Sequence, residues 1–399
     1  MDFSCVVLND DDRAFRDELR SFLRSLVTEE VIERDRRTGE NYDEGVHLAL
    51  GAAGYLAADF RPEAEGGFSA VRRRIWELEI GRAHTPWFHW GTTAMVARCV
   101  EQFGSPRLRD EILPQVLSGH YRLCLGYTEP EGGSDVATCK TRAVRDGSSW
   151  LINGSKMFTS NAQNAQFVFL ITNTDPEAPK HQSLTMFLVP LDSPGVAIQP
   201  IRTVDGDRTN ITYYSDVRVD DKYRVGEVNG GWSVLREALN AEHGTVDRDA
   251  EGLQKLAAMS EHLLLLGEAV DRVAAVAGDE DSARYRLGRA VARMEAAASA
   301  PEMFGRVAIA QTMRDVAPDL MDLLGTAASL PVGANGAADD GAAEAEGMLG
   351  DHVAEHLQRA AVDPGRSGQP EDVFGRRASS APSAPIATIA AVASRSTRA

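Results

Sequence analysis

Two apolar stretches, FVFLIT at residues 167–172 and LTMFLVPL at residues 184–191, decide what kind of fold this sequence adopts. Both are short and rich in β-branched and aromatic residues, which favours β-strands over helices. The segments VAIQPI (196–201) and ITYYSDVRV (211–219) have the same character. Turn-forming residues separate the segments, as in Asp192-Ser193-Pro194-Gly195. The sequence therefore predicts an antiparallel β domain over residues 121–230.

The segments on either side of this β domain have helical spacing. In NDDDRAFRDELRSFLRSLV (9–27) apolar residues recur three or four positions apart. After Gly231 the same pattern returns in GWSVLREALNAEH (231–243) and in the long stretch at 284–313. We therefore expect an α+β multidomain fold. It has an N-terminal helical domain at 1–120, the β domain at 121–230, and a C-terminal helical domain at 231–399 with a Gly/Ala-rich loop near 326–347.

Charge and composition argue against several classes of function. The chain has 399 residues and a net charge of −17, which disfavours binding to nucleic acid and to anionic membranes. No apolar run approaches the roughly 18 to 20 residues that a membrane-spanning helix needs, and the N-terminus lacks the pattern of a secretory signal. The four cysteines have no CxxC spacing and are expected to be reduced thiols. We therefore expect a cytoplasmic protein.

Glu242 is the leading candidate for a catalytic carboxylate. Its helix begins near Gly231 and carries an apolar stripe, and at about 100° per residue Glu242 falls within that stripe. The stripe consists of Trp232, Leu235, Leu239 and Val246. A carboxylate facing a core is costly unless it is paired or its pKa is raised, and a raised pKa suits a general base near neutral pH. The alternative is a carboxylate that is paired with a nearby arginine or that lies at the edge of the stripe, and the residues alone leave both interpretations open.

Two further motifs admit both a structural and a functional interpretation. In YTEPEGGSD (127–135), Pro130 and the two glycines either shape a loop or let backbone N–H groups and Ser134 approach an anionic or carbonyl-bearing ligand. His352 and His356 have a spacing that metal sites use, but no third ligand is evident, so a solvated helix face is favoured and no metal site is expected. The absence of GxGxxG argues against a Rossmann nucleotide site.

Four segments, in this order, resemble the middle domain of the acyl-CoA dehydrogenases. They are LGYTEPEGGSDVATCKTRA (125–143), WLINGSKMFTSNAQNAQFVFLIT (150–172), MFLVPLDSPGVAIQPI (186–201) and RTNITYYSDVRVDDKYRVGEVNGGW (208–232). The resemblance is dense from about residue 100 to 245, fainter before it, and poor after about 270. It implies an N-terminal helical domain, a β-barrel-like middle domain and a C-terminal helical bundle.

The resemblance also implies FAD as cofactor and assigns residues to the site. Those expected to hold the isoalloxazine ring are Leu125, Tyr127, Thr128, Phe158, Thr159 and Ser160. Those expected to meet the thioester substrate or line its channel are Gly133, Ser134, Asn240 and His243. The donors among them would stabilise negative charge as the flavin is reduced.

The reaction implied is α,β-dehydrogenation of an acyl-CoA or another acyl thioester in lipid metabolism. Glu242 would take the α-proton while the β-hydrogen leaves as hydride to FAD N5. Some family members carry the base on the first helix after the β domain, before a common Arg. Glu242 matches that position, with His243 where the Arg is usual. An electron-transfer flavoprotein or similar acceptor is the implied redox partner.

The C-terminal part of the sequence departs from the family pattern. RYRLG (284–288) matches only part of an Arg-x-x-Phe-Gly segment that clasps FAD, and the tail lacks a Gly-Thr-Ser-Glu-type turn. One explanation is a hetero-oligomer in which a second subunit of the same type supplies the missing contacts, in place of a homo-oligomeric dimer or tetramer. Two other functions stay open: a flavin oxidase or monooxygenase of a secondary-metabolite pathway, and a non-catalytic subunit of a heteromeric dehydrogenase.

Overall fold

The chain forms two compact units, which are described separately. One comprises Asp10–Arg248, and the other comprises Asp249–Ala399 with Met1–Asn9. The computed structural model describes residues 8–86, 89–133, 135–203, 207–242, 266–267, 269–271, 273–275, 280–298, 300 and 302–325. At residues 241–242 and 302–306 it describes the backbone alone.

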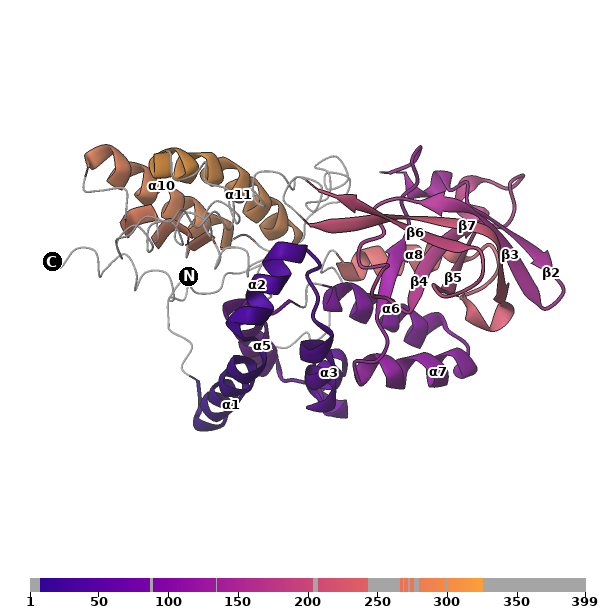
Figure 1. Cartoon of the computed structure of the whole chain (residues 1–399), viewed down its shortest axis with the longest axis horizontal. Coiled ribbons are helices and arrows are strands. Elements are labelled where there is room, and N and C mark those ends of the chain that lie inside the picture. The colour runs from indigo at the N-terminus through magenta and orange to yellow at the C-terminus, as the bar shows by residue number, and fades with distance from the viewer. Residues whose placement is uncertain are drawn as a thin grey trace. The chain divides into compact units, whose positions relative to one another are not determined.

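The first unit begins with helices, drawn in indigo to purple in Figure 1. They are α1 (Asp10–Leu26), α2 (Glu29–Thr38), α3 (Glu44–Ala52), α4 (Tyr55–Phe60), α5 (Ala70–Arg82), α6 (Trp90–Phe103) and α7 (Pro106–Leu117). Several begin at a residue whose side chain accepts a backbone N–H, as Ser69 does from Arg72 and Ser105 from Leu108. The rings of Tyr55 and Trp76 stack at 5.5 Å within their core. The predicted N-terminal helical region is confirmed.

The sheet follows directly. Its strands are β1 (Leu123–Gly126), β2 (Arg142–Asp146), β3 (Ser149–Lys156), β4 (Phe167–Asn173), β5 (Leu184–Pro190), β6 (Val196–Arg202), β7 (Arg208–Asp220) and β8 (Arg224–Val225). They are ordered β6-β7-β3-β2-β4-β5-β8, with β1 beside β4. The four apolar segments of the sequence became β4, β5, β6 and β7. All residues of β4 and β5 except the last are buried, which is why these strands read as continuous apolar runs.

The sheet is antiparallel over most pairings but not all of them. β4 pairs antiparallel with β5 and parallel with β1, with Leu125 opposite Phe169. A single parallel pair, Arg142 with Asn173, joins β2 to β4. The sheet is therefore mixed at its centre, because β1 enters from the helical region in the same direction as β4. The predicted β domain is confirmed, with this refinement of its pairing.

Helix α8 (Gly231–Glu242) leads away from the sheet and packs against α6 and β5. Gly231 lies so close to β5 that a Cβ there would come within 2.8 Å of the Leu184 carbonyl oxygen. Among the α8 side chains that the structure describes, the buried ones are Val234, Leu235 and Ala238. The predicted apolar stripe is therefore only partly right. Trp232 and Leu239 are half-buried instead, since α6 and β5 cover the neighbouring line of positions, and Val246 lies outside the described residues.

The second unit contains α10 (Asp281–Ala298) and α11 (Glu302–Leu324). These helices share an apolar core with residues of the 266–275 stretch, among them Val270 and Val273. The RYRLG segment lies on α10, where Arg286 binds Asp322 at 2.7 Å. This confirms a helical C-terminal region. The Gly/Ala-rich stretch at 326–347, His352 and His356 lie outside the described residues. No helix in the described ranges has the length and apolar character needed to cross a membrane.

Candidate functional site

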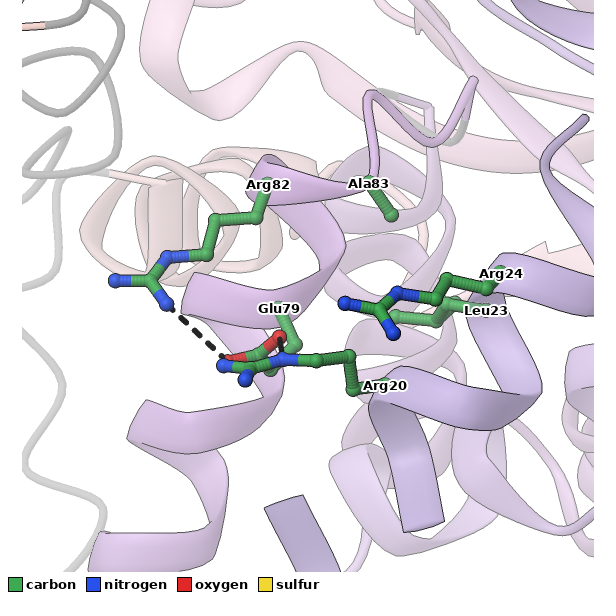
Figure 2. A pocket seen from close by; sticks show the side chains of 6 residues that line it. All are labelled: Arg20, Leu23, Arg24, Glu79, Arg82 and Ala83. Atoms are coloured by element: carbon green, nitrogen blue, oxygen red, sulfur yellow. Dashed lines mark hydrogen bonds and ion pairs between the residues drawn. The ribbon is translucent and has the colours of Figure 1, made fainter. Parts of the chain in front are cut away.

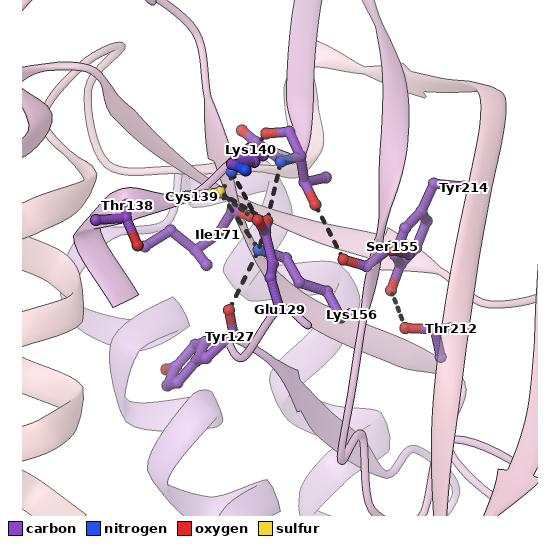
Figure 3. A network of polar contacts seen from close by, with 12 residues as sticks. Tyr127, Glu129, Thr138, Cys139, Lys140, Ser155, Lys156, Ile171, Thr212 and Tyr214 are labelled. Carbon is purple, nitrogen blue, oxygen red and sulfur yellow. Dashed lines mark hydrogen bonds and ion pairs between the residues drawn. The ribbon is translucent and has the colours of Figure 1, made fainter. Parts of the chain in front are cut away.

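A buried ion pair joins the two sequence motifs that were assigned to one ligand. Lys156 Nζ lies 2.8 Å from Glu129 Oε1, and the side chains are 0% and 7% exposed. The same ammonium donates to the Tyr127 carbonyl at 3.3 Å, as Figure 3 shows. Glu129 belongs to the Thr-Glu-Pro turn, and Lys156 ends β3 immediately before the Met-Phe-Thr-Ser segment. The pair therefore fixes the turn after β1 against the turn after β3.

Glu129 also holds a third segment. Its Oε2 accepts the backbone N–H of Lys140 at 2.7 Å, and its Oε1 accepts that of Thr141 at 2.9 Å. The Cys139 thiol lies 3.3 Å from Oε1 as a further donor. Burial alone would raise the pKa of Glu129, but the Lys156 ammonium and these hydrogen bonds lower it to about 2. Burial raises the pKa of Cys139 to about 11, so at neutral pH the carboxyl is ionised and the thiol is not.

The turn at residues 129–132 is tight and is closed by its own backbone hydrogen bonds. Glu129 and Gly132 exchange two backbone hydrogen bonds of 3.1 Å, with Pro130 in the second position of the turn. A Cβ on Gly132 would meet the Thr138 hydroxyl at 2.6 Å, whereas the space beside Gly133 is open. Gly133 is exposed, and Ser134 lies outside the described residues. Of the two glycines, only Gly133 has room beside it for a ligand.

Phe158 stands out by its conformation and exposure. Its φ is 57°, in the left-handed region that residues with a Cβ rarely adopt, and it is 58% exposed. Such a backbone costs about 1 to 3 kcal/mol and persists only where the surroundings impose it. Here Asn210 imposes it: the Thr159 N–H donates to the Asn210 carbonyl at 2.9 Å, and Asn210 Nδ2 donates to the Thr159 carbonyl at 2.9 Å. The result is an exposed aromatic ring on a rigid support, suited to stacking on a planar ligand.

The two residues after Phe158 differ in what they offer. Thr159 is fully buried, and its hydroxyl lies 3.2 Å from that of Thr212 on β7. Ser160 is half-buried, with its hydroxyl 3.0 Å from that of Thr209. The Thr159 side chain is therefore used within the protein, and Ser160 is the more accessible hydroxyl of this step.

The other proposed flavin contacts lie where β1 ends. Leu125 is on β1, Tyr127 and Thr128 follow it, and all three are half-buried. The Met157 N–H donates to the Thr128 carbonyl at 2.8 Å, so this segment runs beside the 156–158 turn. Within the described residues no strand pairs with β1 on the side away from β4. Backbone groups along that side are therefore candidates for contacting a ligand.

Glu242 is the last residue of α8. It comes four residues after buried Ala238 and seven after buried Leu235, a spacing that puts the three positions on one face of the helix. Its side chain and the whole of His243 lie outside what the structure describes. Asn240, two positions earlier, is half-buried.

A cavity of about 320 Å³ lies elsewhere, among the N-terminal helices (Figure 2). Its lining comprises Arg20, Leu23, Arg24, Glu79, Arg82 and Ala83. Arg24 and Arg82 stand in the last turns of α1 and α5, where cations stabilise the negative end of a helix dipole. Arg20 binds Glu79 through two hydrogen bonds of 2.8 and 2.6 Å. Arg20 and Glu79 thus join α1 to α5, and none of the lining residues was a predicted site residue.

Comparison with known proteins identifies the domains. The N-terminal domain of acyl-CoA dehydrogenase matches residues 9–120, and the middle domain of acyl-CoA dehydrogenase matches residues 124–221. Together these matches cover just over half of the chain. Acyl-CoA dehydrogenase FadE29 of Mycobacterium tuberculosis (strain ATCC 25618 / H37Rv) is 35% identical over 242 residues, which are 59% of this chain and 62% of that protein. The matched stretch spans about 60% of the length of FadE29 and of FadE26, another acyl-CoA dehydrogenase of the same organism.

Two solved structures share the fold over most of this chain. The Tcur3481-Tcur3483 steroid ACAD has a TM-score of 0.74 at 27% identity, covering 91% of this chain and 96% of its own. The ChsE4-ChsE5 complex from Mycobacterium tuberculosis has a TM-score of 0.74 at 26% identity, covering 93% and 98%. Each carries the names of two components; the first is called a steroid ACAD and the second a complex.

Proposed function

We propose that this chain, which belongs to the acyl-CoA dehydrogenase family, catalyses the FAD-dependent α,β-dehydrogenation of an acyl thioester with Glu242 as the base. The observation that carries the proposal is the arrangement of the two joined turns. A buried ion pair holds them together, and one of them presents the exposed ring of Phe158 on a strained backbone. Strained and exposed aromatic residues are expected where a ligand binds.

These features fit a flavin, which members of the family bind. The ring of Phe158 offers a stacking surface, and Leu125, Tyr127, Thr128 and Ser160 offer backbone and hydroxyl groups at its edge. When bound, FAD accepts the hydride from the β carbon. The contribution of this chain is to orient the ring and to place fixed donors where negative charge develops, which favours the transition state without reorganisation of solvent.

Glu242 is assigned the proton at the α carbon. The support is its position on α8, four residues after buried Ala238 and seven after buried Leu235, which puts it on the same face of the helix as these two. The neighbouring Asn240 and His243, with Gly133 and Ser134, are assigned to the thioester and the acyl channel. No described group of three or more His, Cys, Asp or Glu side chains is arranged to hold a metal ion, and the proposal uses none.

The test of the base is Glu242→Gln, with Glu237→Gln as its matched control. Glu237 stands five residues earlier on the same helix, about 140° away around its axis. We expect Glu242→Gln to retain flavin and to lower turnover about 10²- to 10⁴-fold, since a general base contributes about that factor. Glu237→Gln should keep wild-type turnover. Equal rates in wild type and Glu242→Gln would refute the assignment of the base.

We further propose a ring-bearing acyl group and a second subunit of the same family. The support is the likeness to a steroid ACAD and to a two-component complex, together with the incomplete FAD motifs after residue 270. The assay of Glu242→Gln is therefore run on the chain alone and co-expressed with a candidate second subunit, using ring-bearing and straight-chain acyl-CoA. Stoichiometric FAD in the chain alone would count against the heteromer.

The same samples separate the competing functions. A non-catalytic subunit would show no flavin absorption in either preparation. An oxidase or monooxygenase would consume oxygen in the absence of an artificial electron acceptor, and a monooxygenase would release a hydroxylated product. A dehydrogenase reduces the artificial acceptor and releases the α,β-unsaturated thioester.

A further inference from the structure

We infer that the buried Lys156–Glu129 pair sets the spacing between the two turns of the proposed flavin site, so that both are positioning residues. The inference rests on the proposed function for its consequence, the binding of flavin. Its structural part rests on contacts alone. Neither residue is assigned a contact with flavin or substrate.

Few hydrogen bonds run directly between the two turns. Both are irregular backbone, outside the ladder of the sheet, and such segments are fixed only by specific bonds. Between them run the hydrogen bond from the Met157 N–H to the Thr128 carbonyl and the two contacts of the Lys156 ammonium, with Glu129 and with the Tyr127 carbonyl. The ammonium thus bonds the residues on either side of Thr128, a proposed flavin contact.

Glu129 also connects the two turns to a third segment, residues 139–141. Its carboxylate receives donors from Lys140, Thr141, Cys139 and Lys156, so both oxygens are occupied. The segment at 139–141 follows Gly133 and Ser134, the proposed thioester contacts. One carboxylate therefore ties together the chain segments that lead to the flavin and to the substrate (Figure 3).

A second ion pair in the same segments provides a matched control. Lys140 binds Glu131, and their side chains are 69% and 66% exposed. Exposed pairs contribute little to structure because water competes for both charges. Lys156→Met and Lys140→Met therefore both remove an ammonium group from the same region. The first removes it from a buried ion pair and the second from an exposed one.

The experiment compares these two variants and the double variant Glu129→Gln/Lys156→Met, all in the full chain, together with its second subunit where one is required. The double variant leaves no unpaired buried charge, so its fold is preserved better than that of Lys156→Met. Hydrogen exchange is measured by mass spectrometry, and FAD affinity by titration of apoprotein. Turnover and the visible flavin spectrum are recorded on the loaded protein.

We expect faster exchange at residues 128–141 and 157–160 in Lys156→Met and in the double variant, with β4 and β5 unchanged. FAD affinity should fall about tenfold, as when one well-placed hydrogen bond is spoiled. Turnover should fall up to about a hundredfold, because a misplacement of about 1 Å has that cost. Lys140→Met should match wild type in every measurement.

Three outcomes would overturn the inference. They are wild-type exchange at both turns in the two Lys156 variants, exchange that rises equally over the whole sheet, and wild-type FAD affinity in a double variant that is fully folded. Failure of wild type to bind FAD would instead refute the proposed function, and the exchange comparison would still decide whether the pair holds the turns.

Discussion

Two nearly buried carboxylates in the first unit, Asp10–Arg248, are bound by cations, but in different ways. Glu129 meets a lysine that is fully buried, at 2.8 Å. Glu79, whose side chain is 5% exposed, meets Arg20 at 2.6 Å and Arg82 at 3.7 Å, and these arginines are 32% and 48% exposed. The Glu129 pair has one cation and is shielded from water, and we call it the dry pair. The Glu79 carboxylate has two partly exposed cations and lines the cavity between α1 and α5, and we call it the open pair.

The difference follows from what each carboxylate joins. Glu79 links two helices whose backbone groups are already paired along the helix, so its arginines add stability to a geometry that packing has set. Glu129 links the irregular turn after β1 to the last residue of β3 and to residues 139–141, and the hydrogen bonds of its carboxylate set the geometry of that turn. A buried charge is costly to maintain, and its placement beside the proposed site is consistent with a role in positioning.

The largest expected effect is on stability when the dry pair is broken. Lys156→Met leaves Glu129 ionised in a buried site with no cation, and loss of one partner of a buried pair costs about 3 to 5 kcal/mol. Urea unfolding followed by circular dichroism measures the change in free energy. The double variant Glu129→Gln/Lys156→Met should regain part of it. A loss below about 1 kcal/mol is what an exposed ion pair would give, and it would contradict the description of the Lys156–Glu129 pair as buried and shielded from water.

Acid provides the second test of the dry pair. The pKa of Glu129 is about 2 in the folded protein, against an ordinary value of 4.5. Its contribution to stability is therefore complete above about pH 4.5 and is lost as pH falls from there toward 2. Between pH 4.5 and pH 3 the loss is about 2 kcal/mol, since each unit corresponds to about 1.4 kcal/mol.

Lys156→Met is the control for that acid effect. Without the ammonium the pKa of Glu129 is higher than in wild type, so in the variant its carboxyl takes up a proton earlier as pH falls and the unpaired buried charge then disappears. The gap in unfolding free energy between wild type and Lys156→Met should therefore narrow from pH 7 to pH 3. A gap that stays constant over this range would contradict the assignment of the depressed pKa to Lys156.

The sequence predicted the regular part of this architecture because apolar patterns report it directly. FVFLIT and LTMFLVPL became β4 and β5, and GWSVLREALNAE became α8, since burial requires apolar side chains at every or every third to fourth position. β1 was missed as a strand because four residues carry too little pattern. Its parallel pairing with β4 depends on how the helical region enters the sheet, which no local pattern records.

The ion pair was missed for a different reason. Glu129 and Lys156 are 27 residues apart, and polar residues near turns are usually exposed. One signal was present. Trp150 and Ile152 are buried on β3, and continuing the two-residue period puts Lys156 on their face of the strand. A lysine on a buried face requires a buried partner, but its identity requires the tertiary fold.

The smallest expected effect is at the helix pair, where two arginines of the same cavity differ in their partners. Arg20 makes two hydrogen bonds to Glu79, whereas Arg24 makes no hydrogen bond or ion pair with any residue that the structure describes. Arg20→Met should lower the free energy of unfolding by about 1 kcal/mol, because Arg82 remains near Glu79 and water reaches the site. Arg24→Met should change it by less than about 0.5 kcal/mol.

Urea unfolding at low and high salt tests both variants, and the cost of Arg20→Met in unfolding free energy should shrink in high salt because the site is open to solvent. A cost for Arg20→Met as large as that for Lys156→Met would remove the distinction between the dry and the open pair.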